Sequence, residues 1–107
     1  MTEKQEAQIA GFLGLCMRAG QLVSGQEACV ELIRAGKAAV ALMDTAAGAN
    51  TQKRLRDACQ SHETPLYGLS PGTLGNAIGH GGRMVAALGA GGMAQKLLHS
   101  LKEEPRL

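Results

Sequence analysis

The sequence contains almost no aromatic residues: Phe12 and Tyr67 are the only two, and tryptophan is absent. RNA-binding modules that stack bases on an exposed sheet need several Phe, Tyr or Trp side chains. This chain cannot supply them, so that class of module is excluded. Any RNA recognition must therefore use backbone amides, polar side chains and shape. For the same reason the core must consist of Ala, Leu, Val, Ile and Met.

Metal-ligand spacing and long apolar runs are also missing. Cys16, Cys29 and Cys59 form no pair with the spacing of a zinc site. We therefore expect buried free thiols, no metal and a reducing, cytoplasmic environment. No apolar run approaches the roughly 18 residues of a membrane span. The polar start of the chain, Met1 to Glu6, does not resemble a signal peptide.

Length and charge set only broad limits. The 107 residues fit one domain, and 45% hydrophobic residues are enough for one core. We place that domain at residues 1–101 and expect a polar, frayed tail at residues 102–107. The formal net charge of +2 permits a polyanionic partner without requiring one.

Apolar residues recur at helical spacing in five segments, and short apolar runs lie between them. Helices alternating with strands predict a three-layer α/β/α sandwich around one small mixed sheet of four strands. The run at 38–43 is apolar throughout, which is typical of a central strand buried on both faces. The predicted strands are Gln21–Val23, Ala38–Met43, Leu66–Leu69 and Met84–Leu88.

Three sites have the chemistry of helix starts. Ser24 and Glu27 fit a capping box, in which each side chain accepts a hydrogen bond from the other residue's amide. Helix stability alone would explain that pair. Asn50 is a second candidate cap, and Ser70-Pro71 combines a capping residue with a proline in the first turn.

Glycines inside the first predicted helix need an explanation, because each lowers helix stability by about 1 kcal/mol relative to Ala. Gly11 and Gly14 lie within this segment. We expect another stretch of backbone to pack close to them.

The stretch from Gly89 to Ala94 matches the glycine fingerprint of dinucleotide-binding folds. Only thirteen residues follow it, with no second strand and no acidic residue at the ribose-binding distance. We therefore interpret it as a tight turn between a strand and a helix. No nucleophile and base stand together in the sequence, so we expect a protein that is not an enzyme and binds no cofactor.

A series of short motifs extends from about residue 9 to residue 101. They include Leu13-Gly14-Leu15, Leu22-Val23-Ser24-Gly25, Ile33-Arg34-Ala35-Gly36-Lys37-Ala38, Asn50-Thr51, Lys53-Arg54-Leu55, Leu74-Gly75 and Ala77-Ile78-Gly79. In order and spacing they resemble the small bacterial YlxQ-type proteins of the L-seven-Ae ribosomal protein family. The resemblance implies an α/β/α sandwich that binds kink-turn RNA, without catalytic residues or cofactor, as a monomer associated with ribosomal or other RNA.

In this family the RNA surface consists of the start of the second helix and the loop before the last strand. The resemblance therefore implies contacts from Gly25, Gln26 and Glu27, and from the loop residues His80, Gly81 and Arg83. Independently, a helix start favours phosphate or base-edge acceptors, and a guanidinium can bind phosphate through two hydrogen bonds.

Lys37 follows the end of the second helix, where it either caps carbonyls or flanks the RNA site. Lys53, Arg54 and Arg56 form a basic cluster on the third helix. A solvated helix face is the usual meaning of such a cluster. In the family this helix lies away from the RNA, although a second RNA segment could reach it.

Acidic substitutions leave an alternative open. Glu27 stands where strong RNA binders of the family carry Asn, Ala28 replaces an acidic residue, and Glu31 stands where members usually carry Lys. A carboxylate facing phosphate lowers affinity. Glu27 and Glu31 lie four residues apart, on one helix face. The alternative is thus a protein-interaction module on the same fold that has lost its RNA affinity.

Overall fold

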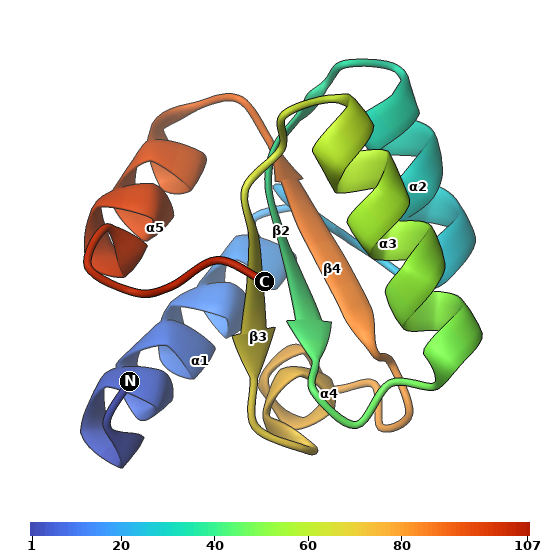
Figure 1. Cartoon of the computed structure of the whole chain (residues 1–107). Coiled ribbons are helices and arrows are strands. Elements are labelled where there is room, and N and C mark those ends of the chain that lie inside the picture. The colour runs from blue at the N-terminus through green and yellow to red at the C-terminus, as the bar shows by residue number, and fades with distance from the viewer.

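The computed structural model describes residues 1–107 as a four-stranded sheet with helices on both faces (Figure 1). This arrangement confirms the predicted α/β/α sandwich. The elements in chain order are α1 (Glu3–Arg18), β1 (Leu22–Ser24), α2 (Gln26–Arg34), β2 (Ala38–Asp44), α3 (Ala49–Ser61), β3 (Leu66–Leu69), α4 (Thr73–Ile78), β4 (Val85–Gly89) and α5 (Gly92–Leu101).

The sheet is mixed and has the strand order β1-β4-β2-β3. Strand β4 is antiparallel to both of its neighbours, β1 and β2, whereas β2 and β3 are parallel. The inner strand β2 is buried over its last five residues, as its unbroken apolar run predicts.

Side chains of alternating strand residues enter two separate cores. Leu42 and its neighbours on one face pack with α1, α4 and α5. Ala41 and Met43 on the other face pack with α2 and α3. All three cysteines are buried free thiols, as the sequence analysis predicts.

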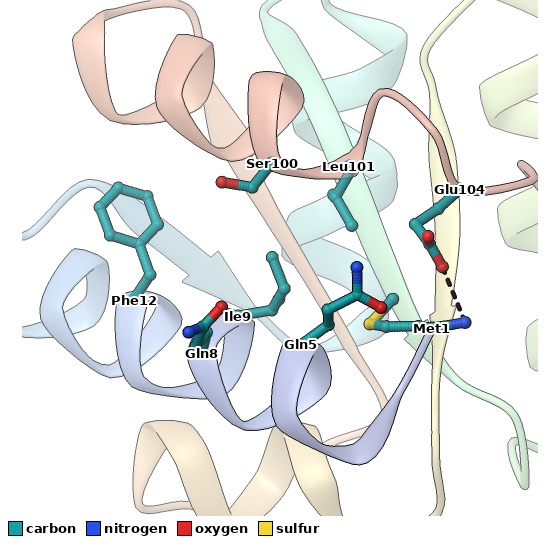
Figure 2. A pocket seen from close by; sticks show the side chains of 8 residues that line it. All are labelled: Met1, Gln5, Gln8, Ile9, Phe12, Ser100, Leu101 and Glu104. Carbon is teal, nitrogen blue, oxygen red and sulfur yellow. Dashed lines mark ion pairs between the residues drawn. The ribbon is translucent and has the colours of Figure 1, made fainter.

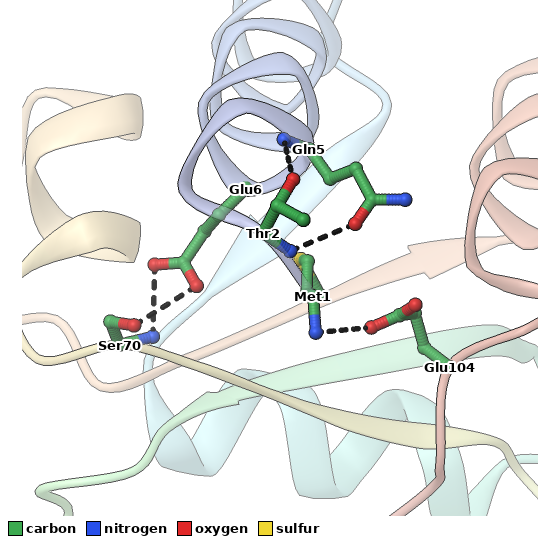
Figure 3. Close-up of polar contacts among 6 residues, drawn as sticks. All are labelled: Met1, Thr2, Gln5, Glu6, Ser70 and Glu104. Carbon is green, nitrogen blue, oxygen red and sulfur yellow. Dashed lines mark hydrogen bonds and ion pairs between the residues drawn. The ribbon is translucent and has the colours of Figure 1, made fainter.

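Helix α1 has a complete capping box (Figure 3). The Thr2 hydroxyl accepts from the Gln5 amide at 3.1 Å, and the Gln5 side chain accepts from the Thr2 amide at 2.8 Å. One turn later, Glu6 accepts hydrogen bonds from the Ser70 amide and hydroxyl and from the Thr73 hydroxyl. A carboxylate of α1 therefore holds the chain that enters α4.

Close backbone packing explains one of the two helix glycines. A Cβ atom at Gly14 would lie 2.9 Å from the carbonyl oxygen of Ala77 in α4, so this prediction is confirmed. Nothing lies within 4 Å of the corresponding position at Gly11, so the prediction is wrong there.

The predicted helix starts are wrong in detail. Ser24 belongs to β1, and Gly25 is the cap residue of α2, without a capping side chain. Helix α3 begins at Ala49 after Gly48, so Asn50 lies inside it rather than capping it. Helix α4 begins at Thr73, and Ser70 instead bonds to Glu6. Pairing with β4 occupies the backbone of Ser24, and Glu6 binds the hydroxyl of Ser70, so neither residue acts as a cap.

The last residues do not fray as expected. The Leu107 amide donates to the carbonyl oxygen of Leu66 in the edge strand β3 at 2.8 Å. The amine of Met1 contacts the Glu104 carboxylate at 2.9 Å (Figure 3). The segment after α5 thus packs along the sheet edge. No helix has the length and apolar character needed to cross a membrane.

Candidate functional site

The starts of α2, α3 and β4 lie together at one end of the sheet (Figure 1). The carboxyl ends of β2 and β3 reach the same end, because these two strands are parallel. The turn before α2 and the loop before β4 carry most of the predicted site residues. The fold therefore brings these two segments together.

Gly25 and Arg83 are in direct contact. The Gly25 amide donates to the carbonyl oxygen of Val85 at 3.0 Å, which fixes the turn to β4. Gly25 has a φ of +94°, a conformation that favours glycine. A Cβ atom at this position would overlap the Arg83 guanidinium. The free side of Gly25 is thus covered by Arg83.

The loop before β4 is packed against α4. The His80 amide donates to the carbonyl oxygen of Gly75 at 3.0 Å, and the Arg83 amide donates to that of His80 at 3.1 Å. A Cβ atom at Gly75 would lie 3.0 Å from the His80 oxygen, so glycine lets the loop approach. His80, Gly81 and Arg83 are exposed. The loop therefore presents them to solvent from a fixed backbone.

Sequence reasoning missed Asp44, a buried carboxylate at the end of β2. Its side chain is only 2% exposed and accepts hydrogen bonds from the amides of Ala46 at 2.7 Å and Gly72 at 2.9 Å. Its own amide donates to the carbonyl oxygen of Met84 at 2.8 Å. The only sequence signal is an acidic residue directly after a buried apolar run.

Asp44 thereby holds three chain segments beside the exposed loop. A hollow of about 270 Å³ lies among them, lined by Asp44, Gly72, Gly75, Gly81 and Arg83, among others.

The second predicted pair, Gln26 and Glu27, contacts α3. The Thr51 hydroxyl donates to the Gln26 side-chain oxygen at 2.7 Å. Arg54 donates to Glu27 at 2.6 Å through Nη1 and at 3.4 Å through Nη2. The hydrogen bond from Arg54 and its positive charge lower the pKa of Glu27, while the same contact raises the pKa of Arg54. The negative charge of Glu27 is therefore balanced within the protein.

Lys37 lies away from this cluster. It follows Gly36, at the opposite end of α2 from Gly25, and its amide donates to the carbonyl oxygen of Leu32 at 3.1 Å. The structure thus gathers six of the seven predicted residues at one end of the sheet and leaves Lys37 at the other.

A second hollow lies between α1 and α5, on the face of the sheet away from α2 and α3 (Figure 2). It measures about 220 Å³, and Phe12 and Ile9 supply much of its apolar wall. No lysine or arginine lines it. Without such cations it is a poor match for a polyanion.

The buried thiols are unsuited to nucleophilic chemistry. Burial raises the pKa of Cys29 to about 12 and that of Cys59 to about 11. The Cys29 sulfur also lies 3.6 Å from the carbonyl oxygen of Val23, to which it donates. Since the thiolate is the reactive form, both side chains serve as packing groups.

The glycine fingerprint is a turn from β4 into α5, as predicted. Because β4 is antiparallel to both neighbours, the turn is not part of a parallel βαβ unit.

Comparisons with known proteins identify relatives. No family model matches the chain. The RNA-binding protein YlxQ of Bacillus subtilis is 36% identical over 91 residues, which cover 84% of this chain and 91% of that protein. The RNA-binding protein YlxQ of Enterococcus faecium is 33% identical over 69 residues, 64% of this chain and 67% of that protein.

Two solved structures have the same fold. A protein of unknown function from Bacillus halodurans matches with a TM-score of 0.82 and 33% identity, covering 91% of this chain and 99% of its own. The 15.5 kD RNA-binding protein of Giardia lamblia matches with a TM-score of 0.78 over 95% of this chain and 91% of its own. Its identity is 14%, so it supports the fold alone. The extent and identity of the Bacillus subtilis match show that this chain belongs to the YlxQ family.

Proposed function

We propose that this protein binds structured RNA of the kink-turn type through Gln26, Glu27, His80, Gly81 and Arg83, with Gly25 shaping the turn that carries Gln26 and Glu27. One observation carries the proposal: the exposed Arg83 guanidinium lies against the turn that begins α2. A cation and a helix start meet there, and both favour phosphate or base-edge acceptors. The relatives named as RNA-binding proteins support RNA as the ligand, without specifying its kind.

The mechanism is capture of a shape and involves no chemical reaction. A rigid loop and a fixed helix start bind bent RNA better than extended RNA, and this difference in affinity shifts the RNA towards the bent form. Ribosomal RNA is one source of such elements, and we propose that the protein acts there as a monomer. The three buried free thiols fit a location in the reducing cytoplasm.

The alternative, a surface for a basic protein, is less well supported. It needs the carboxylates of Glu27 and Glu31 to face the partner together. Arg54 already neutralises Glu27, so Glu31 remains as the carboxylate of that pair without an ion-pair partner.

The test is titration of the purified protein into a fluorescent kink-turn RNA at physiological salt. A control RNA carries Watson–Crick pairs in place of the tandem sheared G·A pairs. We expect tight binding to the first RNA, much weaker binding to the second, and a steep loss of affinity with added salt. Equal weak binding to both RNAs, or no binding, would overturn the proposal.

A further inference from the structure

The RNA surface proposed above borders a third helix that the sequence analysis set apart from it. Two contacts join α2 to α3 at the site end of the sheet: Thr51 with Gln26, and Arg54 with Glu27. The starts of α2 and α3 lie side by side there (Figure 1). RNA lying on Gln26 and Glu27 would therefore pass close to α3.

Arg54 differs from the other two cations of its helix. Lys53 pairs with Asp57 on α3 itself, four residues along, and both side chains are largely exposed. Arg56 lines a groove at the far edge of α3 with Gln60 and Arg106. Arg54 is thus the basic side chain of the cluster that is directed towards α2.

The contact with Glu27 leaves Arg54 able to bind a second acceptor. A guanidinium carries five N–H donors, and the two hydrogen bonds to Glu27 use two of them. The Arg54 side chain is 37% exposed and that of Glu27 is 82% exposed. A phosphate can therefore approach Arg54 from solvent while Glu27 still holds it.

From this geometry, and on the basis of the proposed function, we propose that Arg54 binds an RNA phosphate next to the α2 turn and that Glu27 positions it. In this arrangement the acidic residue of the site orients a cation towards the RNA. The binding surface then extends across both helices of this layer, from Arg83 through Gln26 to Arg54.

The experiment measures the affinity of each variant for the fluorescent kink-turn RNA over a range of salt concentrations. Arg54→Ala removes the proposed contact. Arg56→Ala removes the same charge from the same helix, on a side facing away from α2, and is the matched control. Arg54→Lys keeps the charge without the planar fork. Thermal unfolding of each variant checks that the fold is retained.

We expect Arg54→Ala to weaken binding about tenfold and to lower the slope of log K against log salt by roughly 0.7 to 0.9, the value of one phosphate contact. Arg54→Lys should recover part of the affinity. Arg56→Ala should stay within about twofold of the wild type, because a distant exposed charge contributes little at physiological salt.

A double-mutant cycle separates direct binding from neutralisation of Glu27. If Arg54 contacts phosphate, Arg54→Ala still weakens binding when Glu27→Gln is already present. If the effect disappears in that background, Arg54 only neutralises Glu27 and the inference is wrong. Equal effects of Arg54→Ala and Arg56→Ala would also overturn it, while leaving the proposed function intact. A wild-type protein that binds neither RNA would reject the proposed function, and this inference with it.

Discussion

The two helical layers that cover the sheet are held in different ways. In the layer of α1, α4 and α5, polar groups bond to one another: the capping box at Thr2 starts α1, and Glu6 binds the chain that enters α4. Like α4 and α5, the helices of the other layer, α2 and α3, begin without a capping side chain. Their polar side chains instead meet between the helices, near solvent.

This difference indicates a division of roles. Uncapped starts occur in both layers, and each leaves amides that can donate to a ligand, so the neighbouring charges decide which start suits an anion. The cations Arg54 and Arg83 both lie beside the uncapped start of α2. We therefore expect changes in the α1 layer to alter stability and changes in the α2 layer to alter binding.

The largest change in the free energy of unfolding should come from a core substitution in the α1 layer. Leu13 is completely buried in its core. Leu13→Ala should lower the free energy of unfolding by about 2 to 5 kcal/mol, since it leaves a cavity. Urea denaturation measures this value. The fraction of Leu13→Ala protein that remains folded should bind RNA with unchanged affinity. If the variant instead keeps its stability and binds RNA more weakly, the α1 layer contributes to binding and the proposed division of roles is wrong.

Substitution of Asp44 should produce the next largest loss of stability, because its buried carboxylate holds the chain segments beside the site. Asp44→Ala leaves the amides of Ala46 and Gly72 without their acceptor, at a cost of about 1 to 3 kcal/mol. Hydrogen exchange should show faster exchange at both amides. Asp44→Asn is the control, because it keeps one acceptor oxygen and should recover part of the stability. Unchanged exchange in Asp44→Ala would contradict the assigned role.

Arg83 should affect binding and hardly affect stability. It is exposed, and its side chain lies on Gly25. Arg83→Ala should weaken kink-turn RNA binding by about tenfold, or roughly 1.4 kcal/mol, as expected for the loss of a charged hydrogen-bond donor. Fluorescence titration gives the affinity, and urea denaturation should show a change below about 0.5 kcal/mol. A variant that loses stability and keeps its affinity would reverse the roles of the two layers.

Ionisation of the thiols between α2 and α3 should have the smallest effect on the free energy of unfolding at neutral pH. The effect should grow as the pH rises into the alkaline range. Burial raises the pKa of Cys29 from 9.0 to about 12. Between these two values the unfolded chain ionises and the folded protein does not, so stability falls as pH rises. Urea denaturation from pH 8 to pH 11 should show this decline, and Cys29→Ala should reduce it. If the stability of Cys29→Ala falls equally with rising pH, groups other than Cys29 cause the decline.

Much of the fold follows from local pattern. Each strand lies within about two residues of its predicted place, because apolar runs of strand length between helical segments leave few other arrangements. The close approach at Gly14 was also predictable, since a glycine inside a helix costs stability unless another backbone approaches it.

Helix starts were harder to predict because distant residues decide them. Ser24 has the chemistry of a cap, yet its backbone pairs with Ala86 of β4 and extends the strand. Ser70 also has that chemistry, but Glu6 of α1 binds its hydroxyl. Local spacing cannot reveal either partner. The same limit applies to Arg54 and Glu27, whose contact depends on how α2 and α3 pack.

The site residues came from a family resemblance and could not have been derived from spacing alone. Gly25 and Arg83 lie far apart in the sequence, and only the pairing of β1 with β4 brings them into contact. Asp44 had no motif to mark it, because its role is visible only when three loops converge on its carboxylate and amide.

The pairing of β1 with β4 also has a kinetic consequence. Strand β1 lies near the beginning of the chain, and its only partner in the sheet is β4, close to the end. Contacts between residues so distant in sequence form late, since a long loop must close first. During synthesis, a growing chain that lacks β4 therefore cannot join Gly25 to Arg83. The turn that begins α2 thus gains its contact with Arg83 in one of the last steps of folding.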